Sequence, residues 1–357
     1  MNLAFADGFG HYTQLTQKWT YAFQATISPG SARGSGVAGA EVQSGGNFQK
    51  SLFYRTEWVT GFAVRLNVGE SGFGGGLYEL VAPTFGGGSA ILATVFVEAD
   101  ASLSVYAGPQ SFGHLAGNTG VVGGFYFVPG VWFYIEVDIA FSGSPIGVTA
   151  TLYVNTKKYL NGATATGTVS PSSLICQGTQ SNVHIFGYGT AGSGTTSFAD
   201  IYINETTEGT GVASGVRGDI QVGPYIVPRM DSTIDWSESS GAPPSYVLVD
   251  EVPPDGDATY VFDYAVPDVD DFFFTTIASL VGEIQAVHYC IFQRKDNEGT
   301  RITQPVVNGG ALTSIYAYLA DNYYYYTYPM DTEPGGGAWS VATVNESTFG
   351  LLIAAAP

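Results

Sequence analysis

Two carboxylates, Glu136 and Asp138, stand two residues apart in the segment VWFYIEVDIAF, residues 131–141. Side chains of an extended strand alternate between its two faces, so both carboxylates are expected on one face. Paired carboxylates carry out glycoside hydrolysis, because one donates a proton while the other attacks or stabilises the charged sugar. A strand that presents two acids on one face is therefore a candidate for this chemistry.

The same face continues with side chains suited to holding a sugar. Its expected members are Trp132, Tyr134, Glu136, Asp138, Thr149, Thr151 and Tyr153. Aromatic rings stack on the apolar faces of sugars, and carboxylates accept hydrogen bonds from sugar hydroxyls. We therefore expect a glycan-binding face. The alternatives are a solvated polar face, or a face whose Trp132 and Tyr134 are covered by another subunit or another part of the chain.

A long antiparallel hairpin over residues 131–154 must position these side chains. Its first arm places apolar residues at alternate positions, and its second arm does the same after a turn rich in Ser, Gly and Pro. The expected core residues are Val131, Phe133, Ile135, Val137, Ile139, Phe141, Val148, Ala150, Leu152 and Val154. One face of the hairpin should therefore pack on a core, and the other should be open to water or a ligand.

The composition predicts an all-β protein with two domains. The chain has 357 residues, of which 45% are hydrophobic, 14% aromatic and 12% charged, and it contains 48 glycines. Length and apolar content suffice for two cores, and frequent glycines suit short strands joined by tight turns. We expect two antiparallel β-sandwich domains.

The charge is strongly and unevenly negative. The formal net charge is -19, with 12 Lys and Arg against 31 Asp and Glu, which argues against nucleic acid and membrane insertion. Residues 1–212 hold 12 acids and 7 bases, a difference of −5, whereas residues 213–357 hold 19 acids and 5 bases, a difference of −14. With the Gly- and Thr-rich stretch between the halves, this predicts domains at 1–207 and 219–357, joined by a linker at 208–218.

The first half resembles the concanavalin A-like, or laminin G-like, jelly roll. The resemblance rests on the hairpin, on VHIFG at 183–187 and on FADIYIN at 198–204. In that family, laminarinase-type glycosidases carry Glu-x-Asp-x-Glu, or a form one residue longer, on such a strand. Glu136 and Asp138 match the first two positions, but Ala140 or Phe141 takes the place of the third carboxylate. The resemblance therefore implies no laminarinase-type mechanism, and we expect no catalytic residues and no enzymatic activity.

The second half resembles a domain of virion structural proteins of tailed bacteriophages. The matching pieces are VDEVPPDGDATYV at 249–261, RKDNEGTR at 294–301, and a closing Trp339 with Val344 and Asn345. The resemblance implies a virion protein, assembled in the host cytoplasm, that decorates a capsid or forms part of a tail or fibre. Its expected partners are other virion proteins and a host-surface glycan. The alternative is a carbohydrate-binding module or a glycan hydrolase with a concanavalin A-like domain.

Four consecutive tyrosines predict a subunit contact. Alternation sends Tyr323 and Tyr325 to one face of a strand, and Tyr324 and Tyr326 to the other. One pair can pack inside, while the other is left to a neighbour, and tyrosine is enriched where proteins meet. We therefore expect a homo-oligomer with this row near the contact. The alternative is that an adjacent loop covers the second pair.

Cofactor and disulfide signals are weak. His11, His114, His184 and His288 lack the spacing of metal ligands, and no cofactor is expected. Acidic turns offer weak calcium candidates: Asp255, Asp257, Asp268, Asp270 and Asp271. Cys176 and Cys290 fall in different predicted domains, so a disulfide between them is not expected. No signal peptide or transmembrane segment is apparent.

Overall fold

The computed structural model divides the chain into two units. The first comprises Met1–Gly10 and Gln14–Gly223, and the second comprises His11–Thr13 and Pro224–Pro357. The structure describes residues 2–10, 12–33, 38–53, 55–67, 73–84, 88–167, 181–190, 194–205, 216–223, 228–239, 244–251, 253–278, 282–296, 299–312 and 316–354. Cys176 lies outside these residues, so the expectation about the disulfide stays a prediction.

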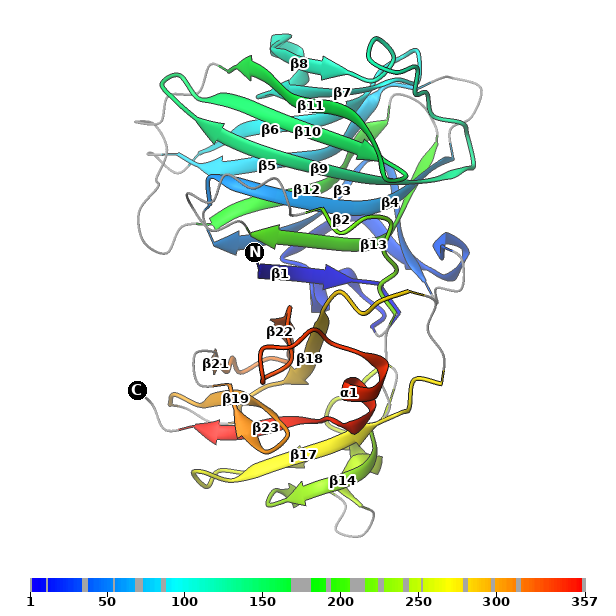
Figure 1. Ribbon diagram of the computed structural model, residues 1–357. Coiled ribbons are helices and arrows are strands. Elements are labelled where there is room, and N and C mark those ends of the chain that lie inside the picture. Colours follow the sequence, from blue (N-terminus) through cyan, green and yellow to red (C-terminus); the bar gives the residue numbers. More distant parts are fainter. Residues whose placement is uncertain are drawn as a thin grey trace. The chain divides into compact units, whose positions relative to one another are not determined.

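The described part of the first unit is built from antiparallel strands (Figure 1). They are β1 (Asn2–Asp7), β2 (Tyr21–Ser28), β3 (Gly39–Phe53), β4 (Glu57–Asn67), β5 (Gly75–Pro83), β6 (Ser89–Val97), β7 (Leu103–Ala107), β8 (Leu115–Asn118), β9 (Trp132–Ser142), β10 (Gly147–Val154), β11 (Lys157–Thr166), β12 (Ser181–Thr190) and β13 (Thr195–Glu205). Short 3₁₀ turns occur at Leu15–Gln17, Pro29–Ser31 and Gln110–Phe112.

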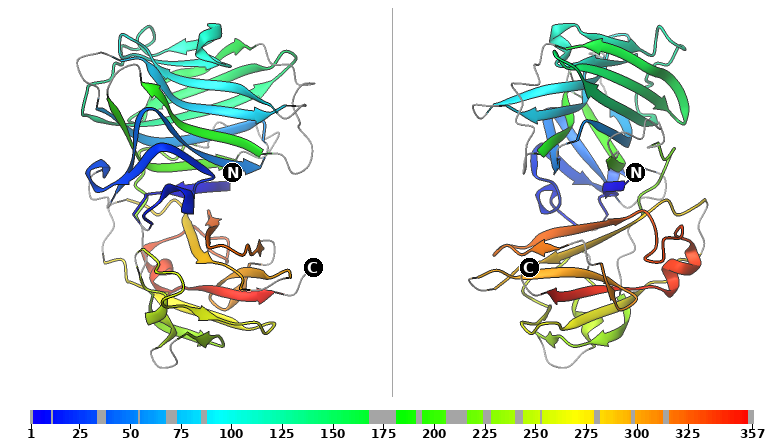
Figure 2. Two further views of the ribbon diagram at one scale, coloured as in Figure 1. Left: turned by 180° about the vertical axis from the view of Figure 1, so that it is seen from behind. Right: turned by 60° about the vertical axis from the view of Figure 1, so that its left-hand side comes forward.

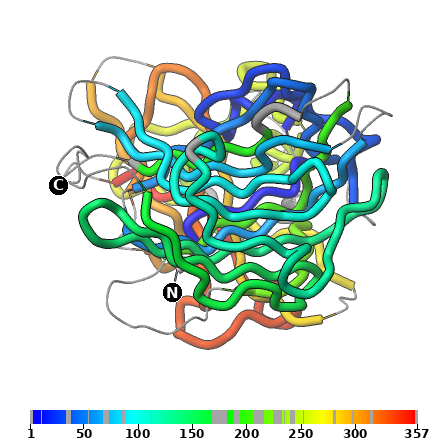
Figure 3. Tube along the Cα trace, turned by 90° about the horizontal axis from the view of Figure 1, so that it is seen from above, coloured from blue at the N-terminus to red at the C-terminus, as the bar shows by residue number. Residues whose placement is uncertain are grey.

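Strand β3 joins the two halves of this sheet. The strand order is β11-β10-β9-β4-β13-β3-β12-β5-β6-β7-β8, with β1 beside β13 and β2 beside β3. Residues 40–43 of β3 pair with β13, and residues 48–53 of the same strand pair with β12. The sheet then curls until β10 and β11 contact β7 and β8, and Figure 3 shows these green and cyan strands side by side. The result is a closed two-layer core.

Aromatic side chains fill that core. Phe48 and Phe186 are fully buried and stacked with ring centroids 5.4 Å apart, and Phe62 meets Phe186 edge-on at 5.6 Å. Such pairs add about 0.5–1.5 kcal/mol beyond the area that they bury. Two polar groups share this interior: the hydroxyl of Tyr78 lies 2.7 Å from Nδ1 of His184. Burial lowers the pKa of His184 to about 3, so its ring is neutral.

The predicted hairpin is formed by β9 and β10, which pair residue by residue from Gly147 opposite Ser142 to Val154 opposite Ile135. Ile135, Val137 and Ile139 are at most 1% exposed. The all-β, antiparallel fold class is confirmed.

The described part of the second unit is also dominated by antiparallel strands, shown from green β14 to red β23 in Figure 2. They are β14 (Pro228–Ile234), β15 (Ser237–Glu238), β16 (Val261–Phe262), β17 (Val269–Phe274), β18 (Val287–Gln293), β19 (Ile302–Val307), β20 (Gly310–Ala311), β21 (Ala317–Tyr318), β22 (Tyr324–Met330) and β23 (Thr348–Ala354), with helix α1 at Val341–Glu346 and a 3₁₀ turn at Ser245–Leu248. One sheet has the order β14-β17-β23-β19-β20 with β21 beside β19. Two further strand pairs, β15-β16 and β18-β22, are not hydrogen-bonded to this sheet. No helix in the described residues is long and apolar enough to cross a membrane.

The second unit has its own core. Val307, Met330, Trp339 and Phe349 pack together, and partly buried apolar residues surround them. The indole nitrogen of Trp339 donates a hydrogen bond to the carbonyl of Met330 at 3.1 Å, which satisfies the polar end of this buried ring.

The tyrosine row begins just before β22 and continues along it, and its side chains alternate as expected. Tyr323 and Tyr325 both pack on Phe292 of β18, each with ring centroids 4.9 Å apart. The hydroxyl of Tyr326 accepts a hydrogen bond from the backbone N–H of Ala320 at 2.9 Å, and Tyr324 is 46% exposed. The role of this row in a subunit contact stays a prediction.

Candidate functional site

The strand pairing places the seven predicted residues on one face of the first unit. On β9, Glu136 lies opposite Gly61 of β4 on one side and opposite Tyr153 of β10 on the other. Asp138 lies opposite Thr151, and Thr149 follows on the same face. The face is turned away from the aromatic core, because Ile135, Val137 and Ile139 of β9 point to the core.

This face is not open along its whole length, which corrects the expectation from sequence. Tyr134 and Glu136 are only 1% exposed, whereas Trp132 and Tyr153 are half-buried and Thr149 is exposed. Asp138 and Thr151, each 9% exposed, lie between these extremes. The physical reason is that a distant part of the chain covers the middle of the face.

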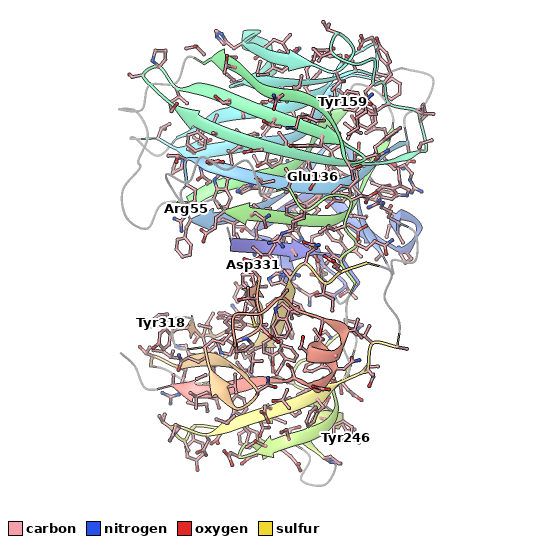
Figure 4. The ribbon with its side chains drawn as sticks, viewed as in Figure 1. Arg55, Glu136, Tyr159, Tyr246, Tyr318 and Asp331 are labelled. Carbon is pink, nitrogen blue, oxygen red and sulfur yellow. The ribbon has the colours of Figure 1, made fainter. Side chains whose placement is uncertain are left out.

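The covering segment is residues 217–222, which we call the strap. The backbone N–H groups of Arg217 and Gly218 donate hydrogen bonds to Oε1 of Glu136 at 2.9 and 2.8 Å. The hydroxyl of Tyr202, on β13, donates to the same oxygen at 2.5 Å. Figure 4 shows Glu136 on the sheet of the first unit. One carboxylate oxygen thus holds the strap on the sheet.

Arg33 fastens the other end of the strap. Its Nη1 donates to Oδ2 of Asp200 at 3.3 Å and to the carbonyl oxygen of Ile220 at 3.2 Å, and its Nη2 pairs with Asp219. The guanidinium also lies 5.1 Å from the ring centroid of Tyr134. Because these partners lie both on the sheet and on the strap, Arg33 ties the two together.

The predicted domain boundary falls inside this arrangement. The linker was expected at 208–218 and the second domain from 219, but residues 216–223 belong to the first unit. The backbone N–H of Val222 donates to Oδ1 of Asp200 at 3.0 Å, which extends the contact to the end of the strap.

The strap and the sheet set the protonation of Glu136. Burial raises the pKa of Glu136, and the hydrogen bonds from Tyr202, Gly218 and Arg217 oppose that rise because they favour the charged form. Its second oxygen, Oε2, is buried and has no hydrogen-bond partner among the described residues. Glu136 is therefore engaged with the chain itself rather than presented to a ligand.

A second carboxylate pair lies beyond the strap. Burial raises the pKa of Asp138 to about 6, and the negative charge of Glu57 adds to the shift. Glu57 opens β4 and lies opposite Ala140, so it stands diagonally across from Asp138 on the same face. Glu57 was not among the residues predicted for this face. Its position directly before the alternating strand 58–68 indicates which face of that strand Glu57 occupies. It does not indicate which residue of another strand lies beside it.

Cations hold the two accessible rings of the face. The guanidinium of Arg65 lies 5.0 Å from the ring centroid of Trp132, and Nζ of Lys158 lies 5.3 Å from that of Tyr153. Such contacts are worth about 0.5–1 kcal/mol at exposed sites. They place a positive charge near each ring.

The calcium candidates are separated by the fold. Oδ1 of Asp270 accepts the backbone N–H groups of Asp235 and Trp236, and Oδ2 of Asp271 accepts a hydrogen bond from the hydroxyl of Thr348 at 2.8 Å. Among the described residues, no three acidic, His or Cys side chains are arranged to hold a metal ion.

The remaining candidates have protein partners of their own. Asp255 accepts a hydrogen bond from the hydroxyl of Thr259 at 2.9 Å, and Asp257 pairs with Arg294 at 2.8 Å. Asp268 shares a hydrogen bond with Asp263, and this raises its pKa.

Comparisons with known proteins give weak likenesses of fold. No protein-family model and no curated protein matches the chain. Among solved structures, an alginate lyase, Aly36B, has 12% identity and a TM-score of 0.38, over 56% of this chain and 96% of its own. A carbohydrate esterase from the Shiga toxin-encoding bacteriophage phi24B has 14% identity and a TM-score of 0.36, over 57% and 100%. The winged bean acidic lectin has 10% identity and a TM-score of 0.36, over 56% and 97%.

These neighbours are carbohydrate-binding or carbohydrate-active β-sandwich proteins, and they correct one expectation. The chain was expected not to be an enzyme, but the lyase, the esterase and a Trypanosoma rangeli sialidase with 14% identity are all enzymes. That expectation is contradicted and is withdrawn. At these identities and TM-scores, the neighbours assign neither an activity nor a ligand to this chain.

Proposed function

We propose that the first unit binds an oligosaccharide on the part of the face that the strap leaves accessible, which we call the open face. The open face consists of Trp132, Asp138, Thr149, Thr151 and Tyr153. The observation that carries the proposal is the pair of half-buried rings, Trp132 and Tyr153, each held by a cation. Rings of this kind stack on sugars, while the carboxylate and the hydroxyls meet sugar hydroxyl groups.

The spacing of the rings favours an oligosaccharide over a single sugar. Tyr153 lies opposite Glu136, and Trp132 precedes Glu136 by four residues on the same strand. Four residues of a strand span about 13 Å. The two rings therefore lie far enough apart to contact different sugar units of one chain that passes beside the covered Tyr134 and Glu136.

The proposal includes a biological setting. We propose that the protein is part of a tailed-phage virion, with other virion proteins as partners, a homo-oligomeric state, and a glycan of the host surface as ligand. The resemblance of residues 249–261 and 294–301 to virion structural proteins supports this setting. The location on a capsid, tail or fibre is tested by imaging the particle with a label on this chain.

Binding is expected to depend on both rings. On a glycan array followed by calorimetry with the full chain, Trp132→Ala and Tyr153→Ala should each weaken binding about tenfold or more, since an aromatic anchor is worth roughly 1.5–2 kcal/mol. Tyr21→Ala is the matched control, because Tyr21 is 46% exposed on β2, away from the open face. Binding that survives both substitutions, or an array without any bound glycan, would contradict the proposal.

A second candidate function is glycan hydrolysis by Asp138 and Glu57. The observation that favours it is a carboxyl with a pKa raised to about 6 beside a second carboxylate. Asp138 would donate its proton to the glycosidic oxygen, and the carboxylate of Glu57 would take a proton from the attacking water. The bond from the sugar carbon to the leaving oxygen breaks as the bond to the water oxygen forms.

This second function has its own pH signature. Activity should fall as the pH rises through about 6, because Asp138 then loses the proton that it must donate. Release of reducing ends from β-glucans should be abolished by Asp138→Asn, whereas Glu136→Gln should leave this acid in place. No release of reducing ends at any pH between 4 and 8 would remove hydrolysis of these glucans from consideration.

A further inference from the structure

Residues 231–271 of the second unit form a long acidic stretch without any basic residue. The stretch contains eleven Asp and Glu and no Lys, Arg or His. Residues 66–156 also lack Lys and Arg, but they hold only six Asp and Glu, so negative charge is denser in 231–271. Such a one-signed region attracts cations and repels anionic ligands, including nucleic acids and acidic sugars.

Within this stretch, an exposed apolar row alternates with half-buried residues. The row consists of Tyr260, Phe262, Tyr264 and Val266, which we call the ridge, and these side chains are 37%, 43%, 79% and 53% exposed. The rings of Tyr260 and Phe262 lie with centroids 5.8 Å apart. Val261, Asp263 and Ala265, between them, are half-buried. The alternation therefore presents one apolar edge to the outside.

Local hydrogen bonds hold the first part of the ridge, Tyr260 and Phe262, in an extended form. Strand β16 pairs with β15, where Phe262 lies opposite Ser237 and Val261 opposite Glu238. The backbone N–H of Tyr260 donates to the hydroxyl of Ser239 at 3.0 Å, and the N–H of Ser239 donates to the carbonyl of Tyr260 at 3.0 Å. A fixed row of rings loses little conformational entropy when a partner binds.

Carboxylates anchor the ridge and crowd beside it. Oδ1 of Asp263 accepts the backbone N–H groups of Tyr264 and Ala265 at 2.5 and 3.0 Å. Asp263 also shares a hydrogen bond with Asp268. This bond and the negative charge of Asp235 both raise the pKa of Asp268. The ridge therefore combines exposed rings with excess negative charge. A positively charged group stacked on a ring satisfies both features at once.

We propose that the ridge docks a basic, extended segment of another protein, whose Arg and Lys side chains lie over Tyr260, Phe262 and Tyr264 and pair with the neighbouring carboxylates. An uncharged glycan could stack on the rings and donate hydroxyl hydrogen bonds to the carboxylates, but it would leave the excess negative charge uncompensated. Charge complementarity therefore selects a basic polypeptide as the occupant. Such a partner also offsets the repulsion within the acidic stretch when it binds.

The test uses the full chain and two synthetic peptides of equal length, one alternating Arg with Leu and one alternating Glu with Leu. Calorimetry should detect binding of the Arg peptide, weakening as salt is raised, and no binding of the Glu peptide. The double variant Phe262→Ser/Tyr264→Ser should weaken binding about tenfold. Tyr318→Ser is the matched control, since Tyr318 is 60% exposed in the same unit.

The possible results separate the ridge from bulk charge. A tenfold loss in the double variant with an unchanged control supports the proposal, provided that both variants keep the circular dichroism and thermal unfolding of the parent. Equal affinity in the parent, the double variant and the control would show attraction to net charge alone and overturn it. A neutral oligosaccharide that binds the ridge when the Arg peptide does not would overturn it as well.

Discussion

Replacing Gly61 with alanine is expected to destabilise the first unit by about 3 kcal/mol, because overpacking a closed site costs this much. Gly61 lies on β4 opposite Glu136, and the ring of Tyr202 rests on its backbone. An added Cβ would lie 2.1 Å from Cε1 of Tyr202, which is far inside van der Waals contact. The ring is fully buried and its hydroxyl is bonded to Glu136, so it cannot move aside without breaking that bond.

Urea unfolding of the parent and the variant measures this cost, and limited proteolysis adds a local readout. Displacement of Tyr202 removes one of the hydrogen bonds that hold Oε1 of Glu136, so cleavage within the strap should become faster. Gly30→Ala is the matched control, since its Cβ would lie 3.6 Å from the nearest atom, in ordinary contact. A Gly61→Ala protein as stable as this control would contradict the packing described for the face.

The stability of the first unit is expected to depend on pH through Glu79, on β5. This side chain is 4% exposed, and burial raises its pKa to about 7. Because the pKa in the folded state lies above that in the unfolded state, the folded state binds the proton more tightly. The contribution of Glu79 to the free energy of unfolding is fully present below about pH 4.5 and is lost as the pH rises through 7. Between pH 5 and pH 8, the loss amounts to about 2 kcal/mol.

Other buried groups also contribute to the pH dependence of stability, and they do so in both directions. Asp138, whose pKa is raised to about 6, acts in the same direction as Glu79. His184 acts in the opposite direction: its pKa is lowered to about 3, so its contribution is present above about pH 6.5 and is lost as the pH falls toward 3. The measurement must therefore isolate Glu79.

Denaturant unfolding at pH 5 and pH 8 of the parent and of Glu79→Gln provides that isolation. The free energy of unfolding of the variant relative to the parent should change between the two pH values by about 2 kcal/mol, in favour of the variant at pH 8. Glu98→Gln is the matched control in the same unit, since Glu98 is half-buried and accepts a hydrogen bond from the hydroxyl of Tyr106 at 2.5 Å. A variant whose difference from the parent is the same at both pH values would show that Glu79 does not titrate in this range.

Alternation made the hairpin and most of its core residues predictable from the sequence, but Val131, expected in the core, is 44% exposed. Ile135, Val137 and Ile139 are spaced every second residue, which places them on one face of a strand, and that face is buried. The closure of the face over Glu136 could not be predicted in the same way. The strap lies about 80 residues further along the chain, has no periodic pattern, and meets Glu136 through backbone N–H groups, which any residue other than proline supplies.

The partner of Asp138 was hidden for a related reason. Glu57 stands at the start of an alternating strand, but the sequence does not say which strand lies beside it. Pairing of β4 with β9 brings together residues 57–65 and 132–140, which is a non-local choice made by the whole sheet. The seven predicted residues share a face because one hairpin carries them, whereas Glu57 joins them only through the topology.

The pairing of β1 with β13 has a consequence for the order of folding. Residues 2–7 pair with residues 201–205, so β1 leaves the ribosome long before its partner β13 has been synthesised. Contacts of such large sequence separation slow folding, and the early strands stay exposed meanwhile. Completion comes later still, because Glu136 receives two of its hydrogen bonds only when residues 217 and 218 have emerged. A fragment that stops at residue 207 would lack these bonds, whereas one that extends to Gly223 contains every residue needed to close the face.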